Sequence, residues 1–294
     1  MTDTVPPLPP LPSPPARPLP RGACDSHAHI FGPFDRFPLA VDRSYTPPEA
    51  AAEDYRAMLD AVGFDRGVVV QGSAHGYDNR AIIDAVERSD GRLRGIVVLD
   101  DTVADDTLAD MAARGVRGLR FTQVVSKRYV GGMKGVSGFD QLYKLAPRLK
   151  EHGLHAQLFA SCPTIIEHID ALLALDVPLV VDHMAKIGAT DWDVTADHYQ
   201  RFVSLVREGR LWCKLTVVRS AQDFPAYAEA RPFQEALVGA NADQLVFGSD
   251  WPLLNLGDRT PDVGRLVDLF RDWFSDDVVN RILVDNPARL YGFG

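Results

Sequence analysis

Cysteine is scarce in this chain: there are three among 294 residues, at positions 24, 162 and 213, and they form no CxxC pair. A disulfide framework and a cysteine-rich zinc site both need closely spaced pairs, so neither is expected. The chain also lacks uninterrupted apolar runs of about 18 residues and the apolar core of a signal peptide, so no membrane-spanning segment is expected. These absences favour a protein of the reducing cytoplasm.

An excess of positive charge is missing as well. The 31 lysines and arginines stand against 40 aspartates and glutamates, which gives a net charge of -9. Binding to nucleic acid or to an anionic membrane depends on basic patches, so neither partner is expected. A small anionic ligand would have to be bound by locally placed arginines or lysines, and a homo-oligomer stays open.

Proline is unevenly distributed, with nine of the 21 in the first twenty residues. Because proline lacks an amide hydrogen and fixes φ, residues 1–21 are expected to form an extended head, in polyproline II conformation, that lies on the surface or hangs free. We expect its deletion to leave catalysis largely intact. Residues 22–294 have the composition of a globular domain, and their length is close to the roughly 250 residues of one α/β barrel.

Eight short apolar runs follow the head, separated by helical patterns such as residues 48–63 and 79–91. The runs span residues 23–31, 67–73, 94–100, 117–123, 155–161, 179–185, 211–216 and 245–251. Apolar strands alternating with helices predict a parallel sheet covered by helices. No GxGxxG or phosphate-binding loop follows any run, which disfavours a doubly wound open sheet. The sequence therefore predicts a single (β/α)8 TIM barrel.

Most of these runs end in polar side chains, which in such a barrel converge at the mouth, the end formed by the C-terminal ends of the strands. His27 and His29 share one face of the first run, as is typical of a metal site or an oxyanion-binding pair. Asp250 follows the core of the eighth run, and His183 lies near the end of the sixth. Strand alternation predicts that Asp182, next to His183, faces the outside of the barrel.

Five motifs occur in the order DSHAHIFGP, VVVQGSAHGYDN, VVDHMAK, FGSDWP and NPARLYGF. Together they resemble the amidohydrolase superfamily (amidohydrolase family 2), and most closely its 2-pyrone-4,6-dicarboxylate lactonase group, over residues 22–293. The resemblance implies a (β/α)8 barrel and a hydrolase that opens an anionic cyclic ester, as in the breakdown of aromatic compounds.

The resemblance also bears on cofactors. Members of the superfamily commonly hold one or two divalent metals through residues that match His27, His29, His183 and Asp250. In the fifth run, Gln157 and Phe159 stand where a metal-binding member has a further ligand, and His155 lies at the start of the run, the wrong end. The lactonase group is similar and works without a metal, so no cofactor is expected. The alternative is a zinc ion held by the same four residues.

The lactonase group implies roles for individual residues. Asp250 would take a proton from water, and His27, His29 and His183 would stabilise the oxyanion. The residues expected to contact the substrate are Arg120, Arg128, Arg219, Ser73, Tyr45 and His75. The three arginines suit a substrate with two or more anionic groups, because a guanidinium binds a carboxylate through two hydrogen bonds.

Two departures from the group leave the substrate open. Phe159 replaces a tyrosine of the group, and Arg219 aligns only after a shift of one residue. A muconolactone or a sugar-acid lactone is therefore a further candidate substrate.

Two other functions stay open. One is a zinc- or manganese-dependent hydrolase or decarboxylase of the same superfamily. The other is a barrel that only binds a ligand or partner, with the proline-rich head recruiting an aromatic-lined domain. The barrel that only binds a ligand or partner predicts that Asp250→Asn leaves function intact.

Overall fold

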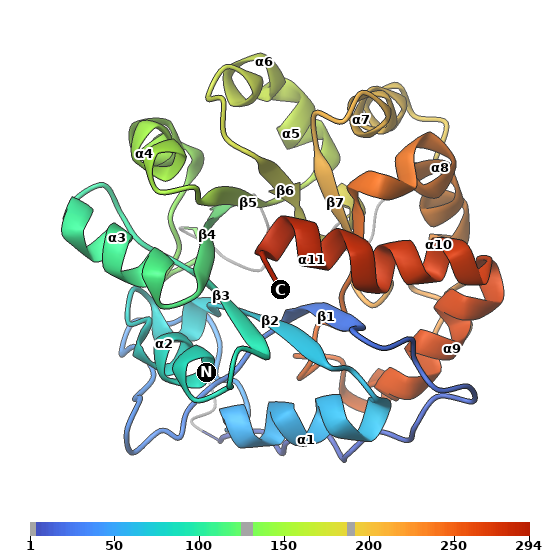
Figure 1. Cartoon of the computed structure of the whole chain (residues 1–294), viewed down its shortest axis with the longest axis horizontal. Coiled ribbons are helices and arrows are strands. Elements are labelled where there is room, and N and C mark those ends of the chain that lie inside the picture. Colours follow the sequence, from blue (N-terminus) through green and yellow to red (C-terminus); the bar gives the residue numbers. More distant parts are fainter. Residues whose placement is uncertain (1–3, 125–131, 187–191) are drawn as a thin grey trace.

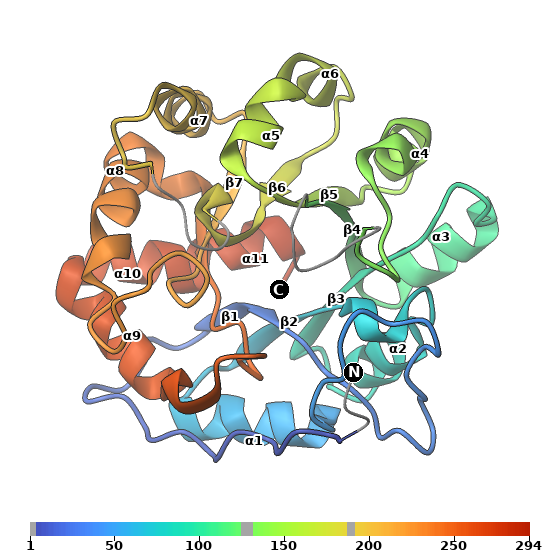
Figure 2. The same ribbon diagram turned by 180° about the vertical axis from the view of Figure 1, so that it is seen from behind.

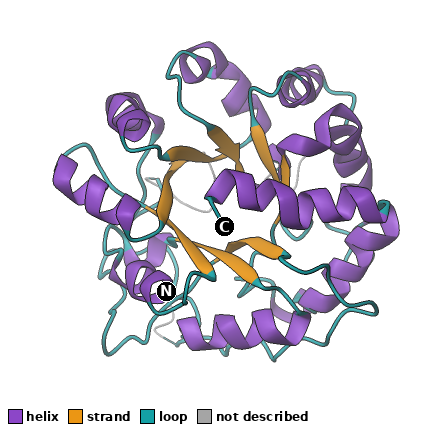
Figure 3. Cartoon of the chain, in the orientation of Figure 1, coloured by secondary structure: helices purple, strands orange, loops and turns teal. Residues whose placement is uncertain are grey.

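Eight parallel strands form one sheet in the order of the chain, and helices surround them (Figures 1 and 3). This computed structural model describes residues 4–124, 132–186 and 192–294. The strands are β1 (Cys24–Ala28), β2 (Arg66–Val70), β3 (Leu93–Val97), β4 (Val116–Gln123), β5 (His155–Ala160), β6 (Leu179–Val181), β7 (Trp212–Leu215) and β8 (Leu245–Phe247). Each coincides with one of the eight apolar runs, so the predicted (β/α)8 TIM barrel is confirmed.

The longer helices bury apolar residues, as α1 does with Tyr55, Met58, Leu59 and Val62. They are α1 (Ala52–Val62), α2 (Arg80–Glu87), α3 (Asp105–Ala113), α4 (Phe139–Glu151), α5 (Cys162–Glu167), α6 (Ile169–Leu173), α7 (Asp197–Arg207), α8 (Arg231–Asn241), α9 (Val263–Trp273), α10 (Asp276–Asn280) and α11 (Asn286–Tyr291). Within the described residues, no helix has the length and apolar character needed to cross a bilayer.

Hydrogen bonds between β1 and the residues that follow β8 close the ring at the mouth. The amide of Asp250 donates to the carbonyl of His27 at 2.8 Å. Below it, the buried carboxylate of Asp25 accepts hydrogen bonds from the amide and the hydroxyl of Ser249, at 2.8 and 2.6 Å. These bonds fix the two strand ends that carry the histidine pair and Asp250.

Helix α11 closes the opposite end of the barrel. It lies in front of the ring of strands in Figure 1 and behind it in Figure 2. Its last residue, Tyr291, is fully buried with its ring 5.7 Å from that of His155 at the start of β5, and its carbonyl accepts a hydrogen bond from Arg117 of β4. His155 therefore lies at the closed end, far from the mouth, as the sequence predicted.

The described part of the head, residues 4–21, contains no helix or strand and lies against α9. The amides of Ser13 and Ala16 donate to Asp262 and Asp268 at 2.7 Å each. Gly264 makes this approach feasible, because a Cβ there would lie 2.1 Å from the carbonyl oxygen of Ser13. Arg17 also forms an ion pair with Asp276 of α10, so the head is attached to the outside of the barrel at α9 and α10.

Deleting residues 1–20 should lower stability and spare catalysis. The lost contacts are mostly exposed hydrogen bonds to α9 and one exposed ion pair to α10, so we expect a loss of about 2 kcal/mol, or roughly 4–8 °C in Tm. Gly264→Ala should displace the same contact without shortening the chain and is the matched variant. Thermal unfolding and turnover of both proteins check this. A folded truncation that had lost most of its turnover would show instead that the head contributes to the mouth.

Candidate active site

Three side chains converge at the mouth between β1 and β8. The Nε2 atoms of His27 and His29 lie 3.3 Å apart, and Oδ1 of Asp250 lies 3.5 and 3.4 Å from them. All three residues are at most 6% exposed. Alternation along β1 puts both histidines on one face, and the bond between the amide of Asp250 and the carbonyl of His27 brings the carboxylate beside them. The structure thus brings together the residues that the sequence singled out.

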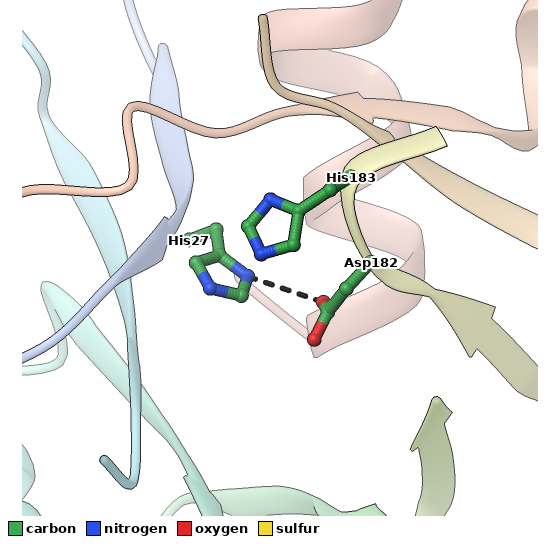
Figure 4. A group of neighbouring side chains, drawn as sticks. All are labelled: His27, Asp182 and His183. Carbon is green, nitrogen blue, oxygen red and sulfur yellow. Dashed lines mark ion pairs between the residues drawn. The ribbon is translucent and has the colours of Figure 1, made fainter. Parts of the chain in front are cut away.

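His183 joins this group from the end of β6, but the expectation for Asp182 was wrong. The strand ends at Val181, and His183 and Met184 adopt left-handed backbone conformations with φ of 53° and 58°. Val180 pairs with Gln157, whose side chain lies inside the barrel, so strand alternation places Asp182, two residues later, on the same inner face. Its fully buried carboxylate lies 3.2 Å from Nδ1 of His27 (Figure 4), and the left-handed turn that follows brings His183 to that face as well. The His183 and His27 rings lie 4.8 Å apart.

A buried polar network below the histidines was missed by the sequence reasoning. Lys214, in β7, is 0% exposed, and its ammonium donates to Oε1 of Gln157 at 2.7 Å and contacts Nδ1 of His27 at 3.2 Å. Gln157 in turn donates to Oδ2 of Asp182 at 3.1 Å. The available signal was a lysine in the middle of an apolar strand, because such a residue needs buried partners.

The two predicted arginines within the described residues both pair with buried carboxylates. Arg120 contacts Oδ2 of Asp182 through two nitrogens at 2.9 Å, with its guanidinium 4.4 Å from the Phe159 ring centroid. Arg219 donates to Oδ2 of Asp250 at 2.5 Å. Each guanidinium thus already binds a carboxylate of the protein. The third predicted arginine, Arg128, lies outside the described residues.

The other predicted contacts gather around Phe31, which follows β1. Its ring is stacked on that of His75 at 5.9 Å and lies edge-on to that of Tyr45 at 6.4 Å. Ser73 and His75 belong to a buried 3-10 turn after β2 (Ser73–His75), and Nδ1 of His75 lies 3.2 Å from the carbonyl of Pro38. The Ser73 hydroxyl and Nε2 of His75 are buried and have no hydrogen-bond partner among the described residues.

Burial and neighbouring charges fix the protonation states. Burial raises the pKa of the Asp250 carboxyl, but the guanidinium of Arg219 and the nearby imidazole of His29 outweigh it and hold that pKa well below its usual range. Burial lowers the pKa of His27 well below its usual value and that of His183 to about 4. At neutral pH the carboxylate is therefore ionised, and these two imidazoles are neutral hydrogen-bond donors and acceptors.

Two groups of side chains, His27 with His29 and Asp250, and His27 with Asp182 and His183, have ligand atoms within 4.8 Å of one another. The first group has the spacing of ligands around a divalent ion. The charges beside both groups do not suit one, because the ammonium of Lys214 lies 3.2 Å from His27 and the guanidinium of Arg219 lies 2.5 Å from Asp250. With these two cations beside the candidate ligands, the residues present do not fit a resident divalent metal.

Known proteins match this chain over nearly its full length. The model of the amidohydrolase family matches residues 24–293. A 2-pyrone-4,6-dicarboxylate hydrolase of Comamonas testosteroni is 35% identical over 95% of this chain and 93% of its own length. A 4-sulfomuconolactone hydrolase of Rhizobium radiobacter is 36% identical over 93% of this chain and 91% of its own length.

A solved structure agrees with these matches. It is that of a Pseudomonas putida protein assigned as a 2-pyrone-4,6-dicarboxylic acid hydrolase, which has a TM-score of 0.78 and 31% identity over 94% of this chain and 99% of its own. The fold, the residues at the mouth and these matches agree. The chain belongs to amidohydrolase family 2, in the group that contains 2-pyrone-4,6-dicarboxylate hydrolase.

Proposed function

We propose that this protein hydrolyses an anionic lactone without a metal, with Asp250 as the general base. The observation that carries the proposal is the buried, ionised carboxylate of Asp250 at the mouth, 3.5 Å from the neutral imidazole of His27. The relatives named above support the substrate class, because both names describe hydrolysis of an anionic cyclic ester.

The reaction needs one proton acceptor and hydrogen-bond donors for one oxyanion. The carboxylate of Asp250 removes a proton from water, whose oxygen attacks the carbonyl carbon of the lactone. The carbonyl oxygen becomes an oxyanion that accepts hydrogen bonds from the histidines. The ring carbon–oxygen bond then breaks, and the proton held by Asp250 passes to the leaving oxygen. One water is consumed and one hydroxy acid is formed.

Arg219 connects substrate binding to this chemistry. In the free protein its guanidinium binds Oδ2 of Asp250 and also donates to the carbonyl of Leu254 at 2.9 Å. A guanidinium binds a substrate carboxylate or sulfonate equally well. An anionic group that takes over the guanidinium releases Oδ2 of Asp250, which makes the carboxylate a stronger base. Neutral lactones lack such a group and should be poor substrates.

A second arginine, Arg259, lines the same cleft as Arg219, together with Tyr227. Arg259 follows β8 and is exposed, and it forms no ion pair with the described residues. Its guanidinium is therefore available to a second anionic group of the substrate. Arg259 was not among the substrate contacts predicted from the sequence.

Arg259→Gln should raise KM for dianionic lactones by about five- to tenfold and change kcat little, because an exposed guanidinium contributes about 1 kcal/mol. Lactones with one anionic group should be affected less. Steady-state kinetics on both classes, with the exposed Arg265→Gln on α9 as the matched control, measure this. An equal effect on both classes would place Arg259 outside the substrate site.

A panel of lactones tests the proposed function itself. Ultraviolet absorbance can follow hydrolysis of 2-pyrone-4,6-dicarboxylate, sulfomuconolactone and neutral aldonolactones. We expect turnover of at least one of the two anionic lactones and little of the neutral ones. Selective turnover of neutral sugar lactones would contradict the roles given to the arginines.

The spacing of His27, His29 and Asp250 favours one alternative, a zinc- or manganese-dependent hydrolase or decarboxylase of the same family. Chelation separates it from the proposed function, because only the metal-dependent enzyme would lose turnover.

A further inference from the structure

We propose that the ammonium of Lys214 is the resident cation of the active site and that it holds His27 in the tautomer with its proton on Nε2. Lys214 then acts as a positioning residue that keeps the site free of divalent metal. This inference concerns the free protein and does not rest on the identity of the substrate.

Three buried polar atoms surround the ammonium of Lys214. Nζ of Lys214 lies 2.7 Å from Oε1 of Gln157, 3.2 Å from Nδ1 of His27 and 3.8 Å from Oδ1 of Asp182. An ammonium can only donate hydrogen bonds, so Nδ1 of His27 must accept. Oδ1 of Asp182 lies at the same distance from this nitrogen, 3.2 Å, as an ion-pair contact, but it is not aligned for a hydrogen bond with any described residue, so the ammonium is the aligned partner of Nδ1.

The hydrogen positions on the imidazoles of His27 and His29 follow from these contacts. With Nδ1 of His27 accepting, the proton of the neutral ring is on Nε2. Nδ1 of His29 lies 2.8 Å from the carbonyl of Val70, which only accepts, so Nδ1 carries a hydrogen, and Nε2 of the neutral ring is then an acceptor. The Nε2 hydrogen of His27 therefore faces Nε2 of His29 at 3.3 Å and Oδ1 of Asp250 at 3.5 Å. Every donor in this series has an acceptor.

The opposite tautomer of His27 fails on the same distances. A proton on Nδ1 would face the hydrogens of the Lys214 ammonium. The lone pairs of His27, His29 and Asp250 would then meet with no hydrogen between them. Such a group needs a cation, and this is the arrangement that binds zinc in proteins.

Nδ1 of His27 and Nδ1 of His29 have different partners, and only His29 has the partner that is usual for a metal ligand. A metal-binding histidine usually donates its other N–H to a carboxylate or a carbonyl. His29 does so with Val70, whereas Nδ1 of His27 has the ammonium as its aligned hydrogen-bond partner, with Oδ1 of Asp182 at the same distance but out of line. With a hydrogen on Nε2, His27 cannot act as a metal ligand beside His29 and Asp250. The same Nε2–H is a hydrogen-bond donor at the mouth.

Nuclear magnetic resonance tests the tautomer in the wild-type protein. Long-range proton–nitrogen correlation on protein with nitrogen-15-labelled histidine distinguishes a proton on Nε2 from one on Nδ1, and His27→Gln assigns the signal by its loss. We expect Nε2–H for His27 in metal-free protein without substrate. Nδ1–H would overturn the proposal, and this readout stands even where a Lys214 variant fails to fold.

Metal uptake tests the role of the charge. Lys214→Met keeps a long side chain and removes the ammonium, and Lys144→Met, on the outer surface of α4, is the matched control. After incubation with Zn²⁺ or Co²⁺ and gel filtration, we expect Lys214→Met to retain about one equivalent and the other two proteins far less, with tetrahedral Co²⁺ absorption only in Lys214→Met. Equal occupancy in all three proteins, full or empty, would overturn the proposal. Both experiments omit the lactone, so their failure is distinct from failure of the proposed function.

Discussion

Asp250→Asn should lower kcat by about 10³-fold or more, toward the upper end of the 10²- to 10⁴-fold contribution of a general base. The amide has nearly the shape of the carboxylate but cannot hold the proton taken from water. Its oxygen can still accept the hydrogen bond of Arg219, so the substitution removes the base and leaves the strand ends in place. KM should change much less than kcat.

Steady-state kinetics and thermal unfolding on the same preparation measure this effect. Asp60→Asn is the matched control, because Asp60 is an exposed carboxylate that pairs with Arg92 on the outside of the barrel. A folded Asp250→Asn protein with near wild-type kcat would show that another group activates water. The non-enzymatic alternative makes a different prediction, since a binding barrel would show no turnover in the wild-type protein.

His183→Asn should lower kcat by about 10²- to 10³-fold, the usual cost of losing one oxyanion donor. Asparagine suits this position because it tolerates the left-handed backbone that His183 adopts at φ 53°. The imidazole is neutral at pH 7, since burial lowers its pKa to about 4, so in the proposed mechanism we expect it to stabilise the oxyanion through a hydrogen bond and not through charge.

The kinetics of His183→Asn should show a fall in kcat with little change in KM, because the hydrogen bond strengthens only as charge develops on the oxygen. His152→Asn, at the end of α4 and away from the mouth, is the control. A rise in KM at unchanged kcat would mean that His183 binds the ground state of the substrate instead.

The sequence predicted the barrel and the core of the site because both follow from simple periodicities. Eight apolar runs between helical patterns allow few arrangements other than a parallel barrel. The period of two along a strand places His27 and His29 on one face, and the eighth strand lies beside the first in a closed ring, which brings Asp250 to them.

What the sequence did not predict depends on backbone turns and on side chains from distant strands. His183 joins Asp182 on the inner face because the chain leaves β6 in a left-handed turn, which no glycine in the sequence indicates. The contacts of Lys214 need β1, β5 and β7 in their final register. The pairing of Arg219 with Asp250 likewise depends on how two loops fold over the mouth, and loop conformation leaves no period in the sequence.

The central claim is that Asp250, without a metal, opens an anionic lactone. The most direct measurement is kcat/KM for 2-pyrone-4,6-dicarboxylate, or for the best anionic lactone of the panel, before and after chelation, with metal content measured on the same samples. We expect kcat/KM to stay within about twofold at far less than one equivalent of metal, since no ion takes part in activating water or binding the oxyanion. Loss of turnover on chelation and its return with one equivalent of zinc would contradict the account.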